Sequence, residues 1–174
     1  MTPLSYRIYT TSFAAVILLL TACAPMPPKP QRTQLQIREF QTRSYDNTKG
    51  QSVRVMKAVI DVLQDEGFII KNADRDLGFI TAAKEVDVED PWASAFAYLG
   101  ANNGQPRYSK NAITEASVNI TEFGKQVKVR AIFQRKVLDN LGGTMGVQQL
   151  EDPRFYQDFF SKVDKGVFIE KQSI

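Results

Sequence analysis

The sequence predicts an α+β domain, in which an antiparallel sheet of five or six strands carries two helices on one face and a short helical insert interrupts one connection. Short runs rich in β-branched residues alternate with turn-forming residues, which is typical of antiparallel strands joined by hairpins. Two longer segments, 51–66 and 153–169, instead repeat apolar residues with the period of an amphipathic helix. Several strands with few helices favour an α+β layout over alternating β and α units.

Residues 1–22 have the organisation of a signal peptide and are not expected to belong to the folded domain. A short polar start with the single cation Arg7 precedes the apolar run 13–20, which is too short to span a membrane. The next residues, Leu20-Thr21-Ala22-Cys23, resemble the lipobox of bacterial lipoprotein precursors. The resemblance implies cleavage before Cys23, which is the only cysteine in the chain, and acylation of that residue. The alternative is an ordinary secretory signal with an incidental cysteine.

Ala24 bears on the destination of such a lipoprotein. In that family, Asp after the lipidated cysteine favours retention in the inner membrane, and here the residue is Ala24. The resemblance therefore implies a lipid-anchored protein of the outer membrane whose domain faces the periplasm. One acyl chain anchors a protein only marginally, whereas two or more hold it stably.

Residues 23–34 are predicted to be the lipidated cysteine and a tether. Four of the eight prolines fall within residues 25–30. Such a segment favours polyproline II, so about ten residues would span roughly 30 Å. The alternative is a docking motif for a partner that recognises proline.

Removal of residues 1–22 leaves 152 of the 174 residues, which is enough for one domain with a proper core and too few for two, so residues 35–174 are expected to form one domain. Arg7 is the only charged residue of segment 1–22, so its loss leaves a nearly balanced charge and no nucleic-acid partner is expected. With Cys23 lipidated no disulfide can form, and stability must come from packing.

The first elements of the domain are a strand and a helix. Leu35 and Ile37 alternate with polar residues before Phe40 breaks the phase, so residues 35–45 suit a strand with a possible bulge. After a turn at 46–50, a helix is expected over 51–66. Gly67 followed by Phe68 predicts a Schellman ending.

Residues 68–71 and 79–84 are two short β-prone runs and predict a hairpin. Asp74, Asp76 and Gly78 lie in the connection and have a partial similarity to a calcium loop. The further ligands of an EF-hand are missing, so we expect a plain turn.

The insert, residues 86–111, differs from the rest of the domain. Asp90 as N-cap, Pro91 at the first helical position and Gly100 past the end predict a helix of about nine residues.

Trp92, Phe96 and Leu99 share one stripe of this helix. They either fold back on the domain as ordinary core or stay exposed as a contact with a partner or a membrane surface. We take them as candidate partner-binding residues.

Three further strands are predicted at 113–123, 126–138 and 144–150, separated by hairpin signals. Alternation assigns one set of side chains to the core: Ala116, Val118, Ile120, Val127, Val129, Ala131 and Phe133. The other set points away, interrupted only by Ile132: Ser117, Asn119, Thr121, Lys128, Arg130, Gln134 and Lys136. The three cations Lys128, Arg130 and Lys136 are further candidate partner-binding residues.

A final helix over 153–169 would cover the apolar face of the sheet. Asp152-Pro153 repeats the capping pair seen before the insert helix. An apolar stripe follows at helical spacing: Phe155, Tyr156, Phe159, Phe160, Val163 and Val167. We expect these side chains to be core, the alternative being an aromatic ligand box.

The sequence lacks the residues of common catalytic sites. It contains no histidine, no nucleophile motif and no phosphate-binding glycine loop. Zinc and other soft metals lack ligands, because the one cysteine is the lipidation site. Carboxylates among residues 65–90 could pair, but no spacing singles out two of them. No enzymatic activity, metal or cofactor is therefore expected.

The predicted order of elements resembles the helix-grip domain of BamC, an accessory lipoprotein of the β-barrel assembly machinery, across roughly residues 35–170. The runs 63–68 and 152–160 resemble those of small uncharacterised proteobacterial outer-membrane lipoproteins. That family has no known activity. The resemblance implies a non-enzymatic accessory or scaffold subunit of an envelope complex, either of outer-membrane assembly or of a secretion apparatus. The alternative is a periplasmic carrier for a lipid or another apolar ligand.

Overall fold

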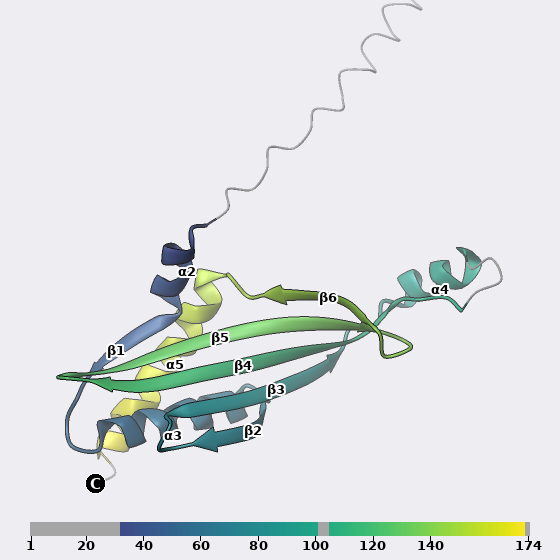
Figure 1. Cartoon of the computed structure of the whole chain (residues 1–174). Helices are drawn as coiled ribbons and strands as arrows, with labels where there is room; N and C mark the ends of the chain where they lie inside the picture. The colour runs from purple at the N-terminus through teal and green to yellow at the C-terminus, as the bar shows by residue number, and fades with distance from the viewer. Residues whose placement is uncertain (1–31, 101–104, 173–174) are drawn as a thin grey trace, which may run out of the picture. The chain divides into compact units, whose positions relative to one another are not determined.

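The computed structural model describes residues 32–100 and 105–172, and the folded unit begins at Thr33 (Figure 1). The elements are, in order, α2 (Gln34–Phe40), β1 (Thr42–Asp46), α3 (Gln51–Asp65), β2 (Ile69–Asp74), β3 (Phe79–Asp87), α4 (Pro91–Gly100), β4 (Ser109–Phe123), β5 (Gln126–Asp139), β6 (Thr144–Gln149) and α5 (Pro153–Gln172). The predicted α+β fold is confirmed. The expected signal peptide, Cys23 and Ala24 lie outside the described residues.

The described strands form a six-stranded sheet in which every pairing is antiparallel. Five strands follow the order β1-β5-β4-β3-β2, and the sixth, β6, pairs with β5. The predicted hairpins are present. Two short strands share one edge of β5: Thr42 of β1 lies opposite Arg130, and Gln149 of β6 lies opposite Gln134. The first half of β5 thus pairs with the start of the domain and the second half with the strand that follows it.

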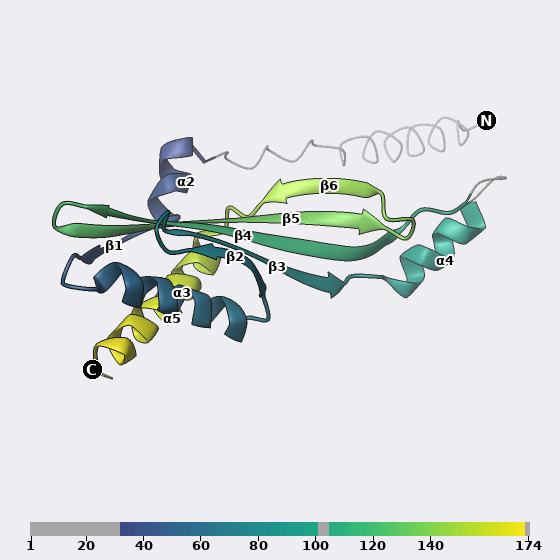
Figure 2. The same ribbon diagram turned by 60° about the horizontal axis from the view of Figure 1, so that its bottom comes forward.

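Helices α3 and α5 lie on the same side of the sheet (Figure 2). All seven side chains assigned to the core on β4 and β5 are buried. Phe133 is at the centre, and its ring centroid lies 4.8 to 5.9 Å from those of four other rings: Phe68, Phe155, Tyr156 and Phe159. Their edge-on geometry is the one that aromatic quadrupoles favour.

The predicted end of α3 is confirmed in detail. Gly67 has φ +83°, a conformation that favours glycine. The Phe68 N–H donates to the Leu63 carbonyl and the Gly67 N–H to the Gln64 carbonyl, both at 2.9 Å. This is the Schellman pattern, and its apolar contact is supplied by Phe68 and Leu63, which are both buried in the core.

The predicted strand over 35–45 is wrong in its first half, because Gln34–Phe40 is helical and only Thr42–Asp46 is a strand. The helix begins with a capping box. The Thr33 hydroxyl accepts from the Gln36 N–H at 3.3 Å, and the Gln36 side chain accepts from the Thr33 N–H at 2.9 Å. Ile37 and Phe40, three residues apart, then both pack inward, Phe40 with its ring 5.1 Å from that of Tyr156. Helical spacing thus prevails over the alternation of Leu35 and Ile37.

Candidate functional site

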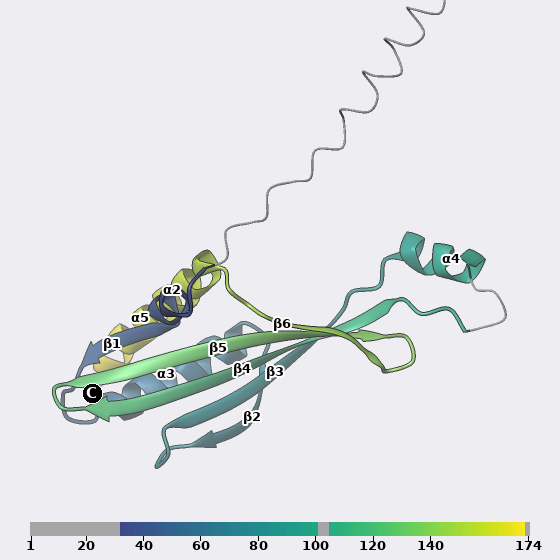
Figure 3. The same cartoon turned by 45° about the horizontal axis from the view of Figure 1, so that its top comes forward.

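The insert helix α4 carries the clearest exposed apolar surface of the described residues. Trp92, Phe96 and Leu99, named here the α4 stripe, are 76 %, 68 % and 83 % exposed. They follow helical spacing on one side, whereas the buried Ser94 lies about 200° around the helix from Trp92. Figures 1 and 3 show α4 beyond the ends of β3 and β4 and away from α3 and α5. The side chains of the α4 stripe are therefore exposed and are not folded back on the domain as core.

The start of α4 is capped as the sequence predicts. The Asp90 carboxylate accepts from the Trp92 N–H at 2.9 Å, and the Asp90 carbonyl accepts from the Ser94 N–H at 2.9 Å. The Ser94 hydroxyl donates to the Pro91 carbonyl at 3.0 Å. A short helix that is marginal by itself in water is thus fixed at its first turn.

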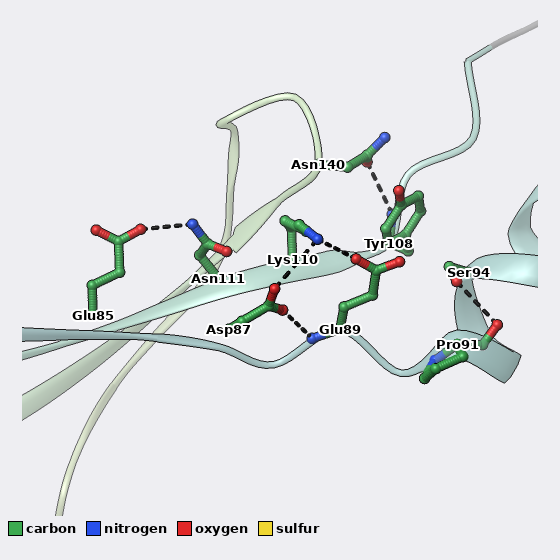
Figure 4. A network of polar contacts seen from close by, with 9 residues as sticks. All are labelled: Glu85, Asp87, Glu89, Pro91, Ser94, Tyr108, Lys110, Asn111 and Asn140. Atoms are coloured by element: carbon green, nitrogen blue, oxygen red, sulfur yellow. Dashed lines mark hydrogen bonds and ion pairs between the residues drawn. The ribbon is translucent and has the colours of Figure 1, made fainter.

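A charged network holds the base of α4 (Figure 4). The Lys110 ammonium bridges the carboxylates of Asp87, at 3.3 Å, and Glu89. The Glu89 N–H donates to the Asp87 carboxylate at 2.9 Å, and the Asn111 amide donates to Glu85 at 2.6 Å. Hydrogen bonds to Glu89 and Asp87 raise the pKa of Lys110, and the Glu89 N–H lowers the pKa of Asp87. These contacts tie the end of β3 to the start of β4. These two chain segments, residues 85–90 and 106–111, carry α4 and are named here the mount of α4.

The β5–β6 turn holds the second segment of the mount, residues 106–111, which leads into β4. The Asn140 side chain accepts from the Tyr108 N–H at 3.2 Å and donates to the Pro106 carbonyl at 3.1 Å. Asp139, whose side chain is 1 % exposed, accepts from two turn amides and lies 3.4 Å from Arg107. These contacts hold the segment before β4 against the β5–β6 turn.

Tyr98 links the helix itself to this mount. Its ring centroid lies 6.1 Å from that of Tyr108, and its hydroxyl raises the pKa of Tyr108 through a hydrogen bond. We did not predict the roles of Glu89, Tyr98, Tyr108, Lys110 or Asn140, because surface charges, amides and tyrosines are common and no spacing marks these. The β3–β4 pairing, with Asp87 opposite Asn111, brings Glu89 to Lys110, and the β5–β6 turn brings Asn140 to Tyr108.

The second candidate surface is the sheet face opposite α3 and α5. Lys128 and Arg130 are exposed and Lys136 is half-buried, all on alternate positions of β5. The side chains beside Lys128 and Arg130 on this face are uncharged and polar: Thr42, Ser44, Asn119 and Thr121. Within residues 32–100 and 105–172, none of the three cations is ion-paired to a carboxylate, although the Lys128 ammonium lies 5.3 Å from the Phe123 ring centroid. The structure does not bring these cations and the α4 stripe into one site.

The other groups with shifted pKa values have structural partners. Burial, then the hydrogen bond to Asp164, raises the pKa of Tyr45. Burial raises the pKa of Tyr156, whose hydroxyl donates to the Leu150 carbonyl at 3.0 Å and accepts from the Phe133 N–H at 3.2 Å. In the described part of the chain, His, Cys, Asp and Glu side chains do not gather in threes that could hold a metal ion.

No protein-family model matches the chain, and no curated protein matches it. Among the described helices, none combines the length and the apolar character needed to cross a membrane.

Proposed function

We propose that this protein is a non-enzymatic outer-membrane lipoprotein whose domain lies in the periplasm and serves as an accessory or scaffold subunit of an envelope complex, either of outer-membrane assembly or of a secretion apparatus. The observation that carries the proposal is the open sheet face of β5 with the three cations Lys128, Arg130 and Lys136. Cations without a carboxylate partner favour a partner with an acidic contact surface, because complementary charge steers association and fixes orientation.

The packing of the core favours this function over that of a ligand carrier. A carrier of the helix-grip type would hold its ligand between the sheet and the helices, where the four rings around Phe133 already fill the space. A groove of about 390 Å³ does run between α3 and α5. Its lining includes five charged residues, which does not suit an apolar ligand: Asp61, Asp65, Lys162, Lys165 and Glu170.

The anchor is tested by two substitutions. Cys23→Ser should leave an unprocessed and unlipidated precursor, and Ala24→Asp should move the protein toward the inner membrane. Palmitate labelling and membrane fractionation measure both. A shortened, palmitate-labelled product from Cys23→Ser would show that the lipobox interpretation is wrong.

The partner surface is tested by photocrosslinking in intact cells. A photoreactive amino acid at Asn119, on the open sheet face, should crosslink to an envelope protein, whereas the same probe at Lys165, an exposed residue of α5 on the other side of the sheet, should not. Adding Lys128→Glu and Arg130→Glu should abolish the crosslink from Asn119, whereas Lys125→Glu, a single charge reversal in the nearby turn, should leave it in place. An undiminished crosslink in the double variant, with its thermal unfolding unchanged, would exclude this face as the contact.

A further inference from the structure

We propose that the α4 stripe is a second membrane contact, which rests in the surface of the same bilayer that holds the lipid on Cys23. This inference rests on the anchor at Cys23 in the proposed function, and it does not depend on a protein partner.

The composition of α4 suits a lipid surface. Pro91–Gly100 contains no charged residue, and its polar side chains are Ser94 and Tyr98. Ser94 is bonded within the helix, and Tyr98 packs against Tyr108. Tryptophan and tyrosine are the residues enriched where a membrane meets water.

The direction of the stripe leaves it without cover from the domain. Ser94 is buried, whereas Trp92, Phe96 and Leu99 lie on the other side of the helix and are exposed. Tyr98 lies between these two sides: it is 61 % exposed, with its ring centroid 6.1 Å from that of Tyr108. The polar contacts of Asp87, Glu89 and Lys110 occupy the base of the helix, so that folding the stripe back would break them.

The anchor and α4 can reach one bilayer together. The Ala131 N–H donates to Gln41 just before β1, and Leu138 lies opposite Asn111 at the root of α4. These two points are separated by about seven residues of strand, which cover about 23 Å. The tether from Cys23 to Thr33 spans roughly 30 Å when extended as polyproline II, so its length suffices for both contacts at once.

The charge around α4 predicts which membranes it binds. Asp87 and Glu89 share the single cation Lys110, and Asp90 adds another carboxylate at the helix start. Anionic lipids would therefore be repelled rather than attracted. Contact must come from burial of apolar side chains, and we expect it with zwitterionic lipid and at high salt.

The chain supplies its own reporter, because Trp92 is its only tryptophan. The full-length lipidated protein is reconstituted in phosphatidylcholine vesicles made with plain or with chain-brominated lipid. Brominated chains should lower the fluorescence of Trp92 about twofold or more, since bromine quenches only an indole that enters the bilayer surface. Phe96→Ser with Leu99→Ser should remove most of this quenching, and the circular dichroism spectrum should be unchanged.

The matched control moves the reporter to another exposed position. Phe123 is 70 % exposed at the β4–β5 turn, so Trp92→Phe combined with Phe123→Trp should give fluorescence that brominated lipid does not quench. Equal quenching at the two positions, or none at Trp92 together with full access to aqueous iodide, would overturn the inference. A probe at Tyr98 that crosslinks only to a protein in cells, with no quenching in vesicles, would also overturn it. Absence of any crosslink from Asn119 in the otherwise unchanged protein, with quenching of Trp92 intact, would instead exclude the proposed partner surface alone.

Discussion

The aromatic residues of α5 and those of α4 follow the same helical spacing and have opposite environments. Phe160 is 2 % exposed and Trp92 is 76 % exposed. Helix α5 lies over the apolar faces of β4 and β5, whereas α4 begins after the last rung of the β3–β4 ladder, Asp87 opposite Asn111, where the nearest groups are charged. An aromatic stripe is therefore core only where the fold places an apolar surface opposite to it, and the stripe of α4 is free for another role.

The largest effect is expected from substitutions that create cavities at the buried aromatic residues of α5. Phe159→Ala and Phe160→Ala should each lower the free energy of unfolding by about 3–5 kcal/mol, because each leaves a cavity in a packed core. That is much of the roughly 5–15 kcal/mol available to a domain. Urea unfolding measures it, with Phe168→Ala, exposed on the same helix, as a control expected within about 0.5 kcal/mol of the parent. Unchanged midpoints would mean that α5 is not a core element.

A smaller effect is expected from the mount of α4. Asp139→Ala removes the acceptor of the Leu141 and Gly143 N–H groups, and unpaired amides of this kind cost about 1–3 kcal/mol. Thermal and urea unfolding measure the loss. Asp61→Ala, an exposed position on α3, is the control and should be nearly neutral. Equal stability of the two variants would mean that the β5–β6 turn is not ordered by Asp139.

Substitutions in the exposed α4 stripe should change the stability of the domain very little. Trp92→Ala combined with Phe96→Ala should change the free energy of unfolding by less than about 1 kcal/mol, as surface substitutions usually do. The same variant should also lose the proposed contact of the α4 stripe with the bilayer surface. A large drop in melting temperature would assign the stripe to the core after all.

The smallest effect is a local pH dependence at the base of α4. The pKa of Asp87 is lowered, so its contribution is present above the ordinary value of 3.8 and is lost as pH falls below it. The pKa of Lys110 is raised, so its contribution is present below 10.5 and is lost as pH rises through and above that value. Protection of the Val88 N–H, which donates to the Lys110 carbonyl, should fall outside this window, while that of the Ala131 N–H in the sheet should not. Parallel behaviour of the two amides would contradict a local network.

Much of the sheet could be predicted because its hairpins are local in sequence and its faces follow strict alternation. The capped starts of α4 and α5 and the glycine after α3 were also local signals. Helix α2 was missed because Leu35 and Ile37 fit a strand, although Thr33 and Gln36 carry the capping signal. The shared edge of β5 could not be predicted, since Thr42 and Arg130 are far apart in the chain.

For the candidate site, the sequence identified the members of the α4 stripe and the cations of β5. It could not decide whether the stripe is exposed, because that depends on what the fold places opposite it. It also gave no sign of the Asp87–Glu89–Lys110 network, whose members meet only through the β3–β4 pairing.

The shared edge of β5 also constrains the order in which the domain can fold. Strand β1, near the start of the domain, has no partner until β5 has been made, and the core under both is closed only by α5, the last described element. Contacts between such distant segments form slowly, because a long loop must be closed before they are gained. During synthesis the early part of the chain therefore has little native structure to hold it. For the exported lipoprotein proposed above, a chain in that state would suit passage through a narrow channel, and folding would be completed only after α5 has crossed.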